Sequence, residues 1–357
     1  MPLTVLSVGY PLAAIKENTA GGAEHILATL DAGLVAAGER SIVLAPTGSR
    51  TAGVLLPTTP IPESLTEEVH AQACEQYKKI IERVIHDDGV DIVHMHGVDF
   101  HKYLPDAGCP VVVTLHLPPD VYPPTIFQSN RPNLHLVCVS RSQSAECPKG
   151  ANLYTTIPNG VSPIHAEYPR VKGNYALCLG RICPEKGFHL AIDAATACGV
   201  PLVLAGVVFG YNSHKHYFEA VIRPRLIPPH KFVGAIGGKQ KMQLLAGARC
   251  LVVPSLVNET ACLAAMEALA CGTPVVAFRR GALVDVIEND KTGYLVDSPE
   301  QLPGAIEATQ YLSSSLCREF AEQHLSASLM VQRYLSLYRD LVTHADSTLG
   351  EALQEAA

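Results

Sequence analysis

The sequence contains no tryptophan and few charged residues, which make up 17% of its 357 positions. Its formal net charge is −7, so it lacks the excess of basic residues typical of general nucleic-acid binders and of proteins that bind anionic membranes. No stretch reaches 18 consecutive apolar residues, which argues against a membrane-spanning helix. The eleven cysteines are scattered singly and form no Cys-x-x-Cys pair, which argues against a disulfide framework. We therefore expect a globular protein of the reducing cytoplasm.

Short apolar runs alternate with helical patterns along the whole chain, which is long enough for two domains. The runs are nearly continuous in apolar residues, as is typical of parallel strands covered by helices on both faces. In the first half they occupy residues 3–8, 41–45, 91–95, 110–115 and 134–139, and in the second half residues 175–179, 201–205, 231–233, 250–253 and 274–278. We therefore predict an α/β protein with two Rossmann-like, doubly wound parallel-sheet lobes that face a central cleft.

The polar, Pro-rich stretch 158–173 separates the two sets of strands and is the best candidate for a domain boundary. We expect residues 1–165 to form an N-terminal Rossmann-like lobe and residues 166–325 a C-terminal Rossmann-like lobe. Residues 326–345 are expected to form a helix that packs back toward the N-terminal lobe, and residues 346–357 a frayed tail.

Residues 253–278 contain the most informative pattern, in which a strand, a polar loop, a small-residue helix and a second strand follow one another. Glu259 stands at the expected start of the helix and Glu267 eight residues later. Eight residues advance a helix by about 12 Å, so the two carboxylates would be too far apart to share one proton or one metal ion. We interpret them as acceptors for hydroxyl groups at two points of a long polar ligand.

Arg181 and Lys186 lie on the loop between the first strand and the first helix of the second half, which begins at Gly180. Two cations beside free backbone N–H groups provide what a diphosphate needs, namely positive charge and many hydrogen-bond donors. The alternative is that both are solvated loop cations.

Gly21 and Gly22 precede the first amphipathic helix, where backbone N–H groups could approach an anion; the alternative is a flexible connection.

His94 and His96 lie on one side of a strand, which makes a metal site conceivable. No carboxylate or cysteine stands at matching spacing, so we instead favour His116, at the end of the next strand, as a residue that lines the ligand site. His96 is the second candidate for that role.

These motifs, in this order, resemble those of the retaining glycosyltransferases of the GT-B fold, family 4 (glycosyltransferase group 1 type). The segment from Glu259 to Glu267 resembles the E-x7-E motif of that family, followed by residues 270–276. The turn from Gly180 to Gly187 resembles its phosphate-binding turn. Residues 21–24, His116 and residues 158–161 also match in order and approximate spacing, so the resemblance extends from residue 3 to about residue 342.

The resemblance implies a transferase that moves a sugar from a nucleotide diphosphate-sugar, UDP-linked in particular, to an acceptor with retention and without a metal. Glu267 would bind the ribose hydroxyls and Glu259 a hydroxyl of the sugar, while Arg181 and Lys186 would stabilise charge on the diphosphate. The resemblance thus predicts catalytic roles for His116, Arg181, Lys186 and Glu259, and donor binding by Gly21, Gly22, Gly180, Arg181, Lys186, Thr260, Ala261, Cys262, Leu263 and Glu267.

The acceptor is not encoded in any pattern that we can interpret, and a small molecule, a lipid-linked sugar and a glycan all remain candidates. No cofactor is expected beyond the nucleotide-sugar donor. The sequence departs from the family pattern at Ala261 and Cys262, where an aromatic residue and a glycine usually contact the sugar and the phosphate. Two alternatives therefore stay open: a nucleotide-sugar-binding protein without transferase activity, and a GT-B-fold nucleotide-sugar epimerase.

Overall fold

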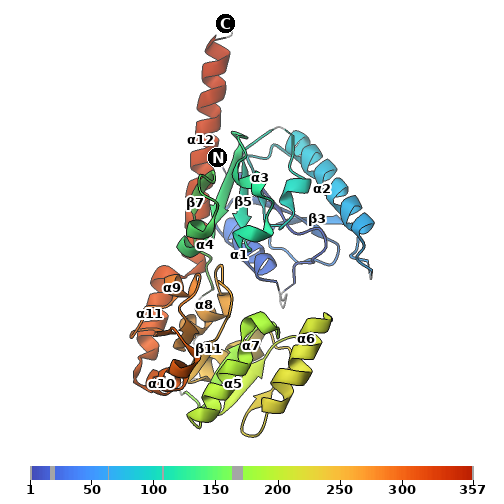
Figure 1. The fold of residues 1–357 in the computed structure, drawn as a ribbon. Helices are drawn as coiled ribbons and strands as arrows, with labels where there is room; N and C mark the ends of the chain where they lie inside the picture. The colour runs from blue at the N-terminus through green and yellow to red at the C-terminus, as the bar shows by residue number, and fades with distance from the viewer. Residues whose placement is uncertain (1, 17–20, 63, 107, 163–171, 356–357) are drawn as a thin grey trace. The chain divides into compact units, whose positions relative to one another are not determined.

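The structure is a computed structural model that describes residues 2–16, 21–62, 64–106, 108–162 and 172–355, with side chains up to residue 344. The chain divides into two compact units (Figure 1). Unit 1 comprises Met1–Gly160 together with Ala327–Ala357, and unit 2 comprises Val161–Ser326. Each unit contains one parallel sheet with helices on both faces, which confirms the predicted α/β class.

The sheet of unit 1 has the strand order β3-β2-β1-β4-β5-β6-β7. Its strands are β1 (Thr4–Val8), β2 (Arg40–Pro46), β3 (Val54–Thr58), β4 (Ile92–Met95), β5 (Val111–Leu115), β6 (Leu134–Cys138) and β7 (Leu153–Thr156). The five strands expected from the apolar runs are confirmed, whereas the two edge strands β3 and β7 were not predicted. Both edge strands are only partly buried; the apolar run of β3 ends after three residues, at Pro57, and β7 ends in two threonines.

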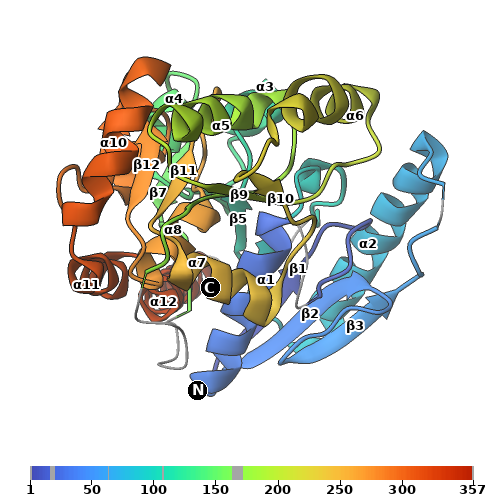
Figure 2. The same ribbon diagram turned by 90° about the horizontal axis from the view of Figure 1, so that it is seen from below.

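The helices of unit 1 are α1 (Gly22–Ala36), α2 (Glu67–Asp88), α3 (Pro124–Phe127), α4 (Arg141–Glu146) and α12 (Ala327–Glu355), with short 3-10 turns η1 (Phe100–Lys102) and η2 (Pro119–Val121). Helix α2 packs its apolar side, from Cys74 to Val84, on the sheet face formed by Leu6, Val93 and alternating residues of neighbouring strands. Figure 2 shows α1 on the other side of β1 and β2. The buried residues Ile26, Leu27, Leu30, Asp31 and Leu34 form the inward side of α1.

Helix α12 belongs to unit 1 although unit 2 precedes it in the sequence. It packs against α1, where a Cβ atom on Gly33 would lie 2.3 Å from a methyl group of Val331. The hydroxyl group of Tyr334 lies 2.7 Å from Thr114 Oγ1, and that of Tyr338 lies 2.6 Å from His94 Nδ1. The helix continues to Glu355, into the segment 346–357 for which the sequence predicts a frayed tail. Alanine, leucine and glutamate are frequent beyond His344 and are strong helix formers.

The sheet of unit 2 has the order β10-β9-β8-β11-β12-β13. Its strands are β8 (Ala176–Leu179), β9 (Leu202–Ala205), β10 (Lys231–Phe232), β11 (Cys250–Val253), β12 (Val275–Phe278) and β13 (Gly293–Val296). Edge strand β13, which is only partly buried, was not predicted. The other five strands agree with the apolar runs.

The helices of unit 2 are α5 (Phe188–Ala197), α6 (Asn212–His216), α7 (Gly238–Gly247), α8 (Leu263–Ala270), α9 (Leu283–Val286), α10 (Leu302–Ala308) and α11 (Ser314–His324), and a 3-10 turn, η3 (Pro184–Lys186), precedes α5. One face of the sheet is covered by α5, α6 and α10, and the opposite face by α7, α8 and α11 (Figure 2). Two hydrophobic cores therefore enclose the strands and fix the loops at their ends.

In both units the strand order reverses once, between β1 and β4 in unit 1 and between β8 and β11 in unit 2. Ligands of open α/β sheets bind beyond the carboxyl ends of the strands at such a reversal. In unit 2, Gly180 follows β8 and Pro254 follows β11, so the segments that contain Arg181, Lys186 and Glu259 begin at this point. In unit 1, His96 follows β4 and Gly9 follows β1.

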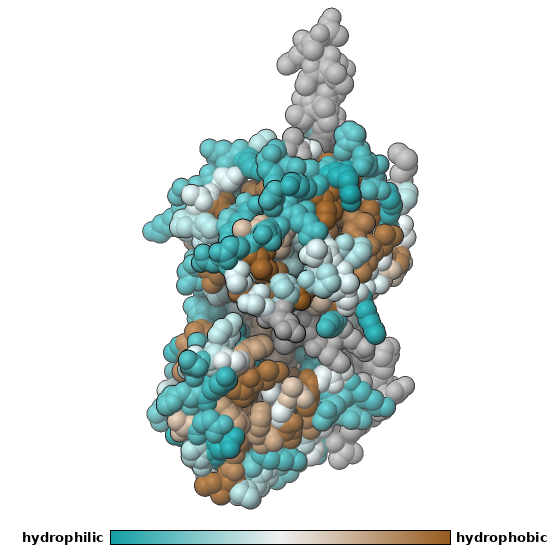
Figure 3. Space-filling model, turned by 90° about the vertical axis from the view of Figure 1, so that its right-hand side faces the viewer, coloured by the Kyte–Doolittle hydropathy of each residue, from teal (hydrophilic) through white to brown (hydrophobic). Residues whose placement is uncertain are grey.

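All eleven cysteines are free, as expected from their spacing. Among the described residues, no helix combines the length and the apolar character needed to cross a lipid bilayer. Helix α2, the longest helix of the first 160 residues, exposes many charged side chains on its outer face. Figure 3 looks onto the side where α2 lies in Figure 1 and shows hydrophilic residues over much of that surface.

Candidate functional site

Lys186 and Glu259 form an ion pair in unit 2 that joins the turns after β8 and β11. Lys186 Nζ donates to Glu259 Oε1 at 2.5 Å, and both side chains are largely buried. Burial alone would lower the pKa of Lys186, but the Glu259 carboxylate raises it above its ordinary value. Lys186 is therefore a fixed positive charge at neutral pH. The exposed Arg181, on the same turn, is the second cation that the sequence predicts for a diphosphate.

A second ion pair, between Lys241 and Glu267, lies on the adjacent helices α7 and α8. Lys241 Nζ donates to Glu267 Oε1 at 2.6 Å, and the Glu267 side chain is 10% exposed. Lys241 was not among the residues predicted from the sequence. Its one signal was its position in a Gly-rich, Lys-containing segment after β10, 26 residues before Glu267. Only the packing of α7 against α8 shows that these two residues meet.

Glu259 is not part of the helix that contains Glu267, which corrects the sequence prediction. Helix α8 begins at Leu263, and Glu259 lies in the preceding loop. The two carboxylates therefore do not lie on one helix, and the rise of about 12 Å expected for eight helical residues does not apply to them. The two carboxylates have different partners. Glu259 pairs with a lysine of the turn η3, and Glu267 pairs with a lysine of α7.

Two glycines allow the loop around Glu259 to approach its neighbours closely. A Cβ atom on Gly187, whose φ is +61°, would lie 2.2 Å from the Pro254 carbonyl oxygen. A Cβ atom on Gly281, whose φ is +50°, would lie 2.5 Å from the Glu259 carbonyl oxygen, which accepts a hydrogen bond from the Ala282 amide at 2.7 Å. The loop from Pro254 to Glu259 is thus packed closely against the turn that follows β8 at one end and the turn that follows β12 at the other.

Cys262 adopts a left-handed backbone conformation, with φ +58° and ψ +68°, at the N-cap of α8. A Cβ atom makes this conformation cost about 1–2 kcal/mol. Burial, and then the nearby Glu259 carboxylate, raise the pKa of the Cys262 thiol to about 12, so it is neutral at pH 7 and not a nucleophile. The position where the sequence departs from the family pattern is therefore a strained position in the structure.

Replacing Cys262 with glycine should raise the free energy of unfolding by about 0.5–1 kcal/mol, because relief of the left-handed strain exceeds the entropy that glycine loses on folding. Urea denaturation followed by circular dichroism measures the change. Ala261→Gly is the matched control: Ala261 has no positive φ, so this variant should gain nothing. An equal or larger stabilisation from Ala261→Gly would contradict the strain at Cys262.

In unit 1, Gly21 and Gly22 lie at the start of α1, Gly21 as its N-cap. Residues Thr19 and Ala20 of the predicted loop lie outside the described residues. A Cβ atom on Gly21 would lie 1.7 Å from Glu24 Oε2, so the carboxylate of Glu24 covers the helix N-terminus. Burial raises the pKa of Glu24. An anion at this helix end would have to displace that carboxylate, which already interacts favourably with the helix dipole.

His116 follows β5 and is half-buried. Burial lowers its pKa to about 4, so its imidazole is neutral at pH 7. His116 Nε2 lies 3.0 Å from His96 Nδ1, and Nε2 of His96 is buried with no hydrogen-bond partner among the described side chains. Burial, followed by the nearby His94 and His116, also lowers the pKa of His96. The two histidines favoured from the sequence therefore form one neutral, hydrogen-bonded pair.

The metal site considered for His94 and His96 is not supported. Their rings do lie on the same side of β4, with centroids 4.1 Å apart. However, His94 Nε2 lies 2.7 Å from Thr114 Oγ1 and His94 Nδ1 lies 2.6 Å from the Tyr338 hydroxyl group. Both ring nitrogens are engaged in hydrogen bonds, so neither is available to a metal. His94 instead connects β4 to the C-terminal helix.

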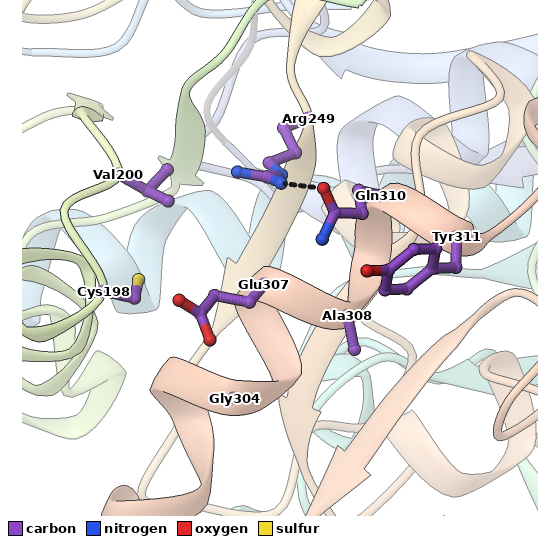
Figure 4. A pocket seen from close by; sticks show the side chains of 8 residues that line it. All are labelled: Cys198, Val200, Arg249, Gly304, Glu307, Ala308, Gln310 and Tyr311. Carbon is purple, nitrogen blue, oxygen red and sulfur yellow. Dashed lines mark hydrogen bonds between the residues drawn. The ribbon is translucent and has the colours of Figure 1, made fainter.

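Figure 4 shows a hollow of about 520 Å³ on unit 2, lined by Cys198, Val200, Arg249, Gly304, Glu307, Ala308, Gln310 and Tyr311. Val200 precedes β9 and Arg249 precedes β11, so the hollow lies at the amino ends of these strands. An Arg249 N–H group donates to Gln310 Oε1 at 3.2 Å within it. The predicted donor residues follow the carboxyl ends of the strands, so this hollow is distinct from them.

Comparison with known proteins gives one match to a family. Residues 163–323 match the family described as "Glycosyl transferases group 1". The matched segment contains every residue of unit 2 discussed above, including the two lysine–glutamate pairs and Cys262.

Solved structures resemble the chain over nearly its whole length, and two of them serve as examples. One is AviGT4, described as a glycosyltransferase involved in avilamycin A biosynthesis, with a TM-score of 0.72, 24% identity and coverage of 96% of this chain and 98% of the other. The second is Alr3699/HepE of Anabaena in complex with UDP and glucose, with a TM-score of 0.73, 18% identity and coverage of 95% and 100%. At these identities the likeness shows the fold.

Among curated proteins, the chain is similar to a GDP-mannose-dependent α-(1-6)-phosphatidylinositol dimannoside mannosyltransferase of Mycobacterium tuberculosis. The two are 32% identical over 180 residues, which are 44% of each chain. The chain spans less than half of the length of the curated relatives that it matches at 31–32% identity.

Proposed function

Because residues 163–323 form a glycosyl transferases group 1 domain in a chain of the GT-B fold, we propose that the protein transfers a sugar from a nucleotide diphosphate-sugar to an acceptor. The resemblance to group 1 glycosyltransferases of the GT-B fold, predicted from the sequence motifs, is confirmed. The observation that carries the proposed activity is the Lys186–Glu259 ion pair beyond β8 and β11, where ligands of doubly wound sheets bind, with the Lys241–Glu267 pair on the adjacent helices α7 and α8.

Glu259 and Glu267 serve as acceptors for the hydroxyl groups of the donor. Each uses Oε1 to bind its lysine, and a carboxylate held in such an ion pair can accept further hydrogen bonds at its other oxygen. Hydrogen bonds to charged groups contribute about 1.5–3 kcal/mol each. We assign Glu267 to the ribose hydroxyls and Glu259 to a hydroxyl of the sugar, as the family resemblance suggests.

Lys186 and Arg181 stabilise the diphosphate leaving group. Negative charge accumulates on the diphosphate as its bond to the sugar breaks, and a cation already held in place stabilises that charge without reorganisation. Lys186 is held by Glu259 and by the turn at Gly187, so it is fixed in position before the donor binds. With these two cations we propose that transfer needs no divalent metal at the diphosphate.

We propose a front-face displacement that retains the configuration of the anomeric carbon. The acceptor hydroxyl attacks from the face that the diphosphate leaves, and its proton passes to the departing phosphate oxygen as the new carbon–oxygen bond forms. Burial lowers the pKa of His116 and keeps its imidazole neutral. We therefore assign His116 a hydrogen-bonding role at the reaction centre and not the role of a cation.

The donor is tested by a thermal-shift panel of UDP, GDP, ADP and dTDP and their sugars. We expect UDP and a UDP-sugar to stabilise the protein most; a ligand at about 100 times its dissociation constant adds about 2.7 kcal/mol. The relatives leave both UDP and GDP as candidates, since one is named GDP-mannose-dependent and one structure contains UDP. The largest shift with another base would overturn the assignment to UDP.

Incubation with the best donor then distinguishes the three functions. A transferase is expected to release the nucleoside diphosphate, either when an acceptor is present or slowly by hydrolysis of the donor. If the transferase is metal-independent, this release continues in the presence of EDTA. Conversion of the donor into an isomeric nucleotide-sugar without acceptor would identify an epimerase instead. Tight binding with neither reaction would identify a binding protein, and loss of release with EDTA would contradict metal independence.

A further inference from the structure

Three side chains of unit 1 converge between α2 and the turn after β4. His70 and Cys74 are one helical turn apart on the same face of α2, and Asp99 lies immediately before η1. Cys74 Sγ is 3.6 Å from His70 Nε2 and 3.7 Å from Asp99 Oδ2, while His70 Nε2 is in hydrogen-bond contact with Asp99 Oδ2. One imidazole nitrogen, one sulfur and one carboxylate oxygen thus meet at a single point.

These distances agree with those between the ligands of a tetrahedral zinc ion. Zinc–sulfur bonds of about 2.3 Å and zinc–nitrogen or zinc–oxygen bonds of about 2.0–2.1 Å, at tetrahedral angles, place sulfur about 3.5–3.6 Å from the other ligand atoms. Both distances from Cys74 Sγ are close to this value. Only His70 Nε2 and Asp99 Oδ2 would have to separate, to about 3.3 Å.

The surroundings hold these ligands in place. The Tyr103 hydroxyl group donates to Asp99 Oδ1 at 2.9 Å, which leaves Oδ2 directed at His70 and Cys74. Hydrogen bonds of this kind, to a ligating carboxylate, orient the ligands of metal sites. Cys74 and Asp99 are buried, whereas the His70 side chain is 23% exposed. A metal ion here would therefore have three protein ligands and one side open to water.

We propose that His70 Nε2, Cys74 Sγ and Asp99 Oδ2 bind one zinc ion, with water as the fourth ligand. A mixed set of nitrogen, sulfur and oxygen ligands suits zinc. Binding replaces the hydrogen bond between His70 and Asp99, and the thiol proton passes to solvent. The ion joins α2 to the turn after β4. This site is in unit 1 and does not depend on the proposed transferase activity, whose diphosphate-binding cations are in unit 2.

Cobalt(II) is the probe for the test, because it takes the same tetrahedral site as zinc and is coloured. Titration of the full chain should show one bound ion, a thiolate-to-cobalt charge-transfer band and the intense d–d bands of a tetrahedral complex. Added zinc should abolish these bands. Cys74→Ser should remove the charge-transfer band, and Tyr103→Phe, which loses the hydrogen bond to Asp99, should weaken binding by about 10–100-fold.

Two cysteine variants serve as matched controls. Cys109→Ser removes another thiol of unit 1. Cys183→Ser removes the thiol of a second cluster, formed by Cys183, Glu185 and His214, in which the possible ligand atoms also lie within 4.8 Å of one another. Both controls should keep the charge-transfer band. The proposal would be overturned if the wild-type protein showed no charge-transfer band. It would also be overturned if Cys183→Ser lost the band and Cys74→Ser kept it.

His70→Asn keeps the test decisive should Cys74→Ser fail to fold, since His70 is partly exposed and at the helix surface. Circular dichroism establishes that the variant is folded. A folded His70→Asn protein is expected to lose the tetrahedral d–d bands. Cobalt binding with wild-type affinity and spectrum in this variant would exclude His70 as a ligand and the proposed site with it.

Discussion

Replacing Lys186 with methionine should lower kcat/KM for sugar transfer by about 10²- to 10³-fold, the usual effect of removing one preorganised group that stabilises charge in a transition state. Lys186 is held at 2.5 Å from Glu259 and carries a raised pKa, so its charge is present and fixed throughout the reaction. Methionine keeps most of the length of the side chain and removes the ammonium group. Steady-state kinetics with the best donor measures the loss.

The difficulty with this variant is that it also leaves Glu259 largely buried and without its lysine, which lowers stability. The double variant Lys186→Met with Glu259→Gln removes both charges and should regain much of the stability, as judged by urea denaturation. It should not regain activity, because the cation is still missing. Recovery of activity in the double variant would mean that Lys186 only neutralises Glu259 and has no part in the reaction.

Replacing Glu267 with alanine should weaken binding of the nucleoside diphosphate by about 10–100-fold, which corresponds to the loss of hydrogen bonds to a charged acceptor. Glu267 is buried on α8 and held by Lys241 at 2.6 Å, so its carboxylate is fixed in position before the nucleotide binds. Isothermal titration calorimetry with the nucleoside diphosphate, without any sugar, isolates this contribution. Unchanged affinity would show that Glu267 does not bind the ribose.

Lys241 and Lys239 provide the controls for this second result. Lys241→Met should also weaken nucleotide binding, because it frees the Glu267 carboxylate from its fixed position. Lys239 lies two residues away on α7 and is exposed, so Lys239→Met should leave the affinity unchanged. A similar loss in both lysine variants would indicate a general effect of positive charge on α7 and not a specific arrangement of Glu267.

The fold was largely predictable because the inner strands of both sheets are covered on both faces and therefore read as apolar runs. The edge strands β3, β7 and β13 were missed: each is only partly buried, and the apolar runs of β3 and β13 are three residues long. The C-terminal part of α12 was missed because the prediction relied on an apolar face, whereas the composition of that segment alone favours a helix.

A residue of the candidate site could be predicted where its own short segment marks it. Lys186 and Glu259 are 73 residues apart, but each was singled out because its segment follows a strand end at the reversal of the sheet. Lys241 was missed because nothing in its own segment marks it, and its role depends on which helices are neighbours. The sequence marked Cys262 as unusual, but only the structure shows its left-handed backbone.

Unit 1 is discontinuous along the chain, and this determines the order in which a ribosome can complete the two units. Unit 2 is one uninterrupted segment, so all of its residues have been synthesised before α12 exists. Until then, His94 and Thr114 lack the tyrosine hydroxyl groups of α12 with which they form hydrogen bonds. The nascent chain can therefore finish unit 2 first, while unit 1, although begun earlier, stays incomplete until α12 has been synthesised.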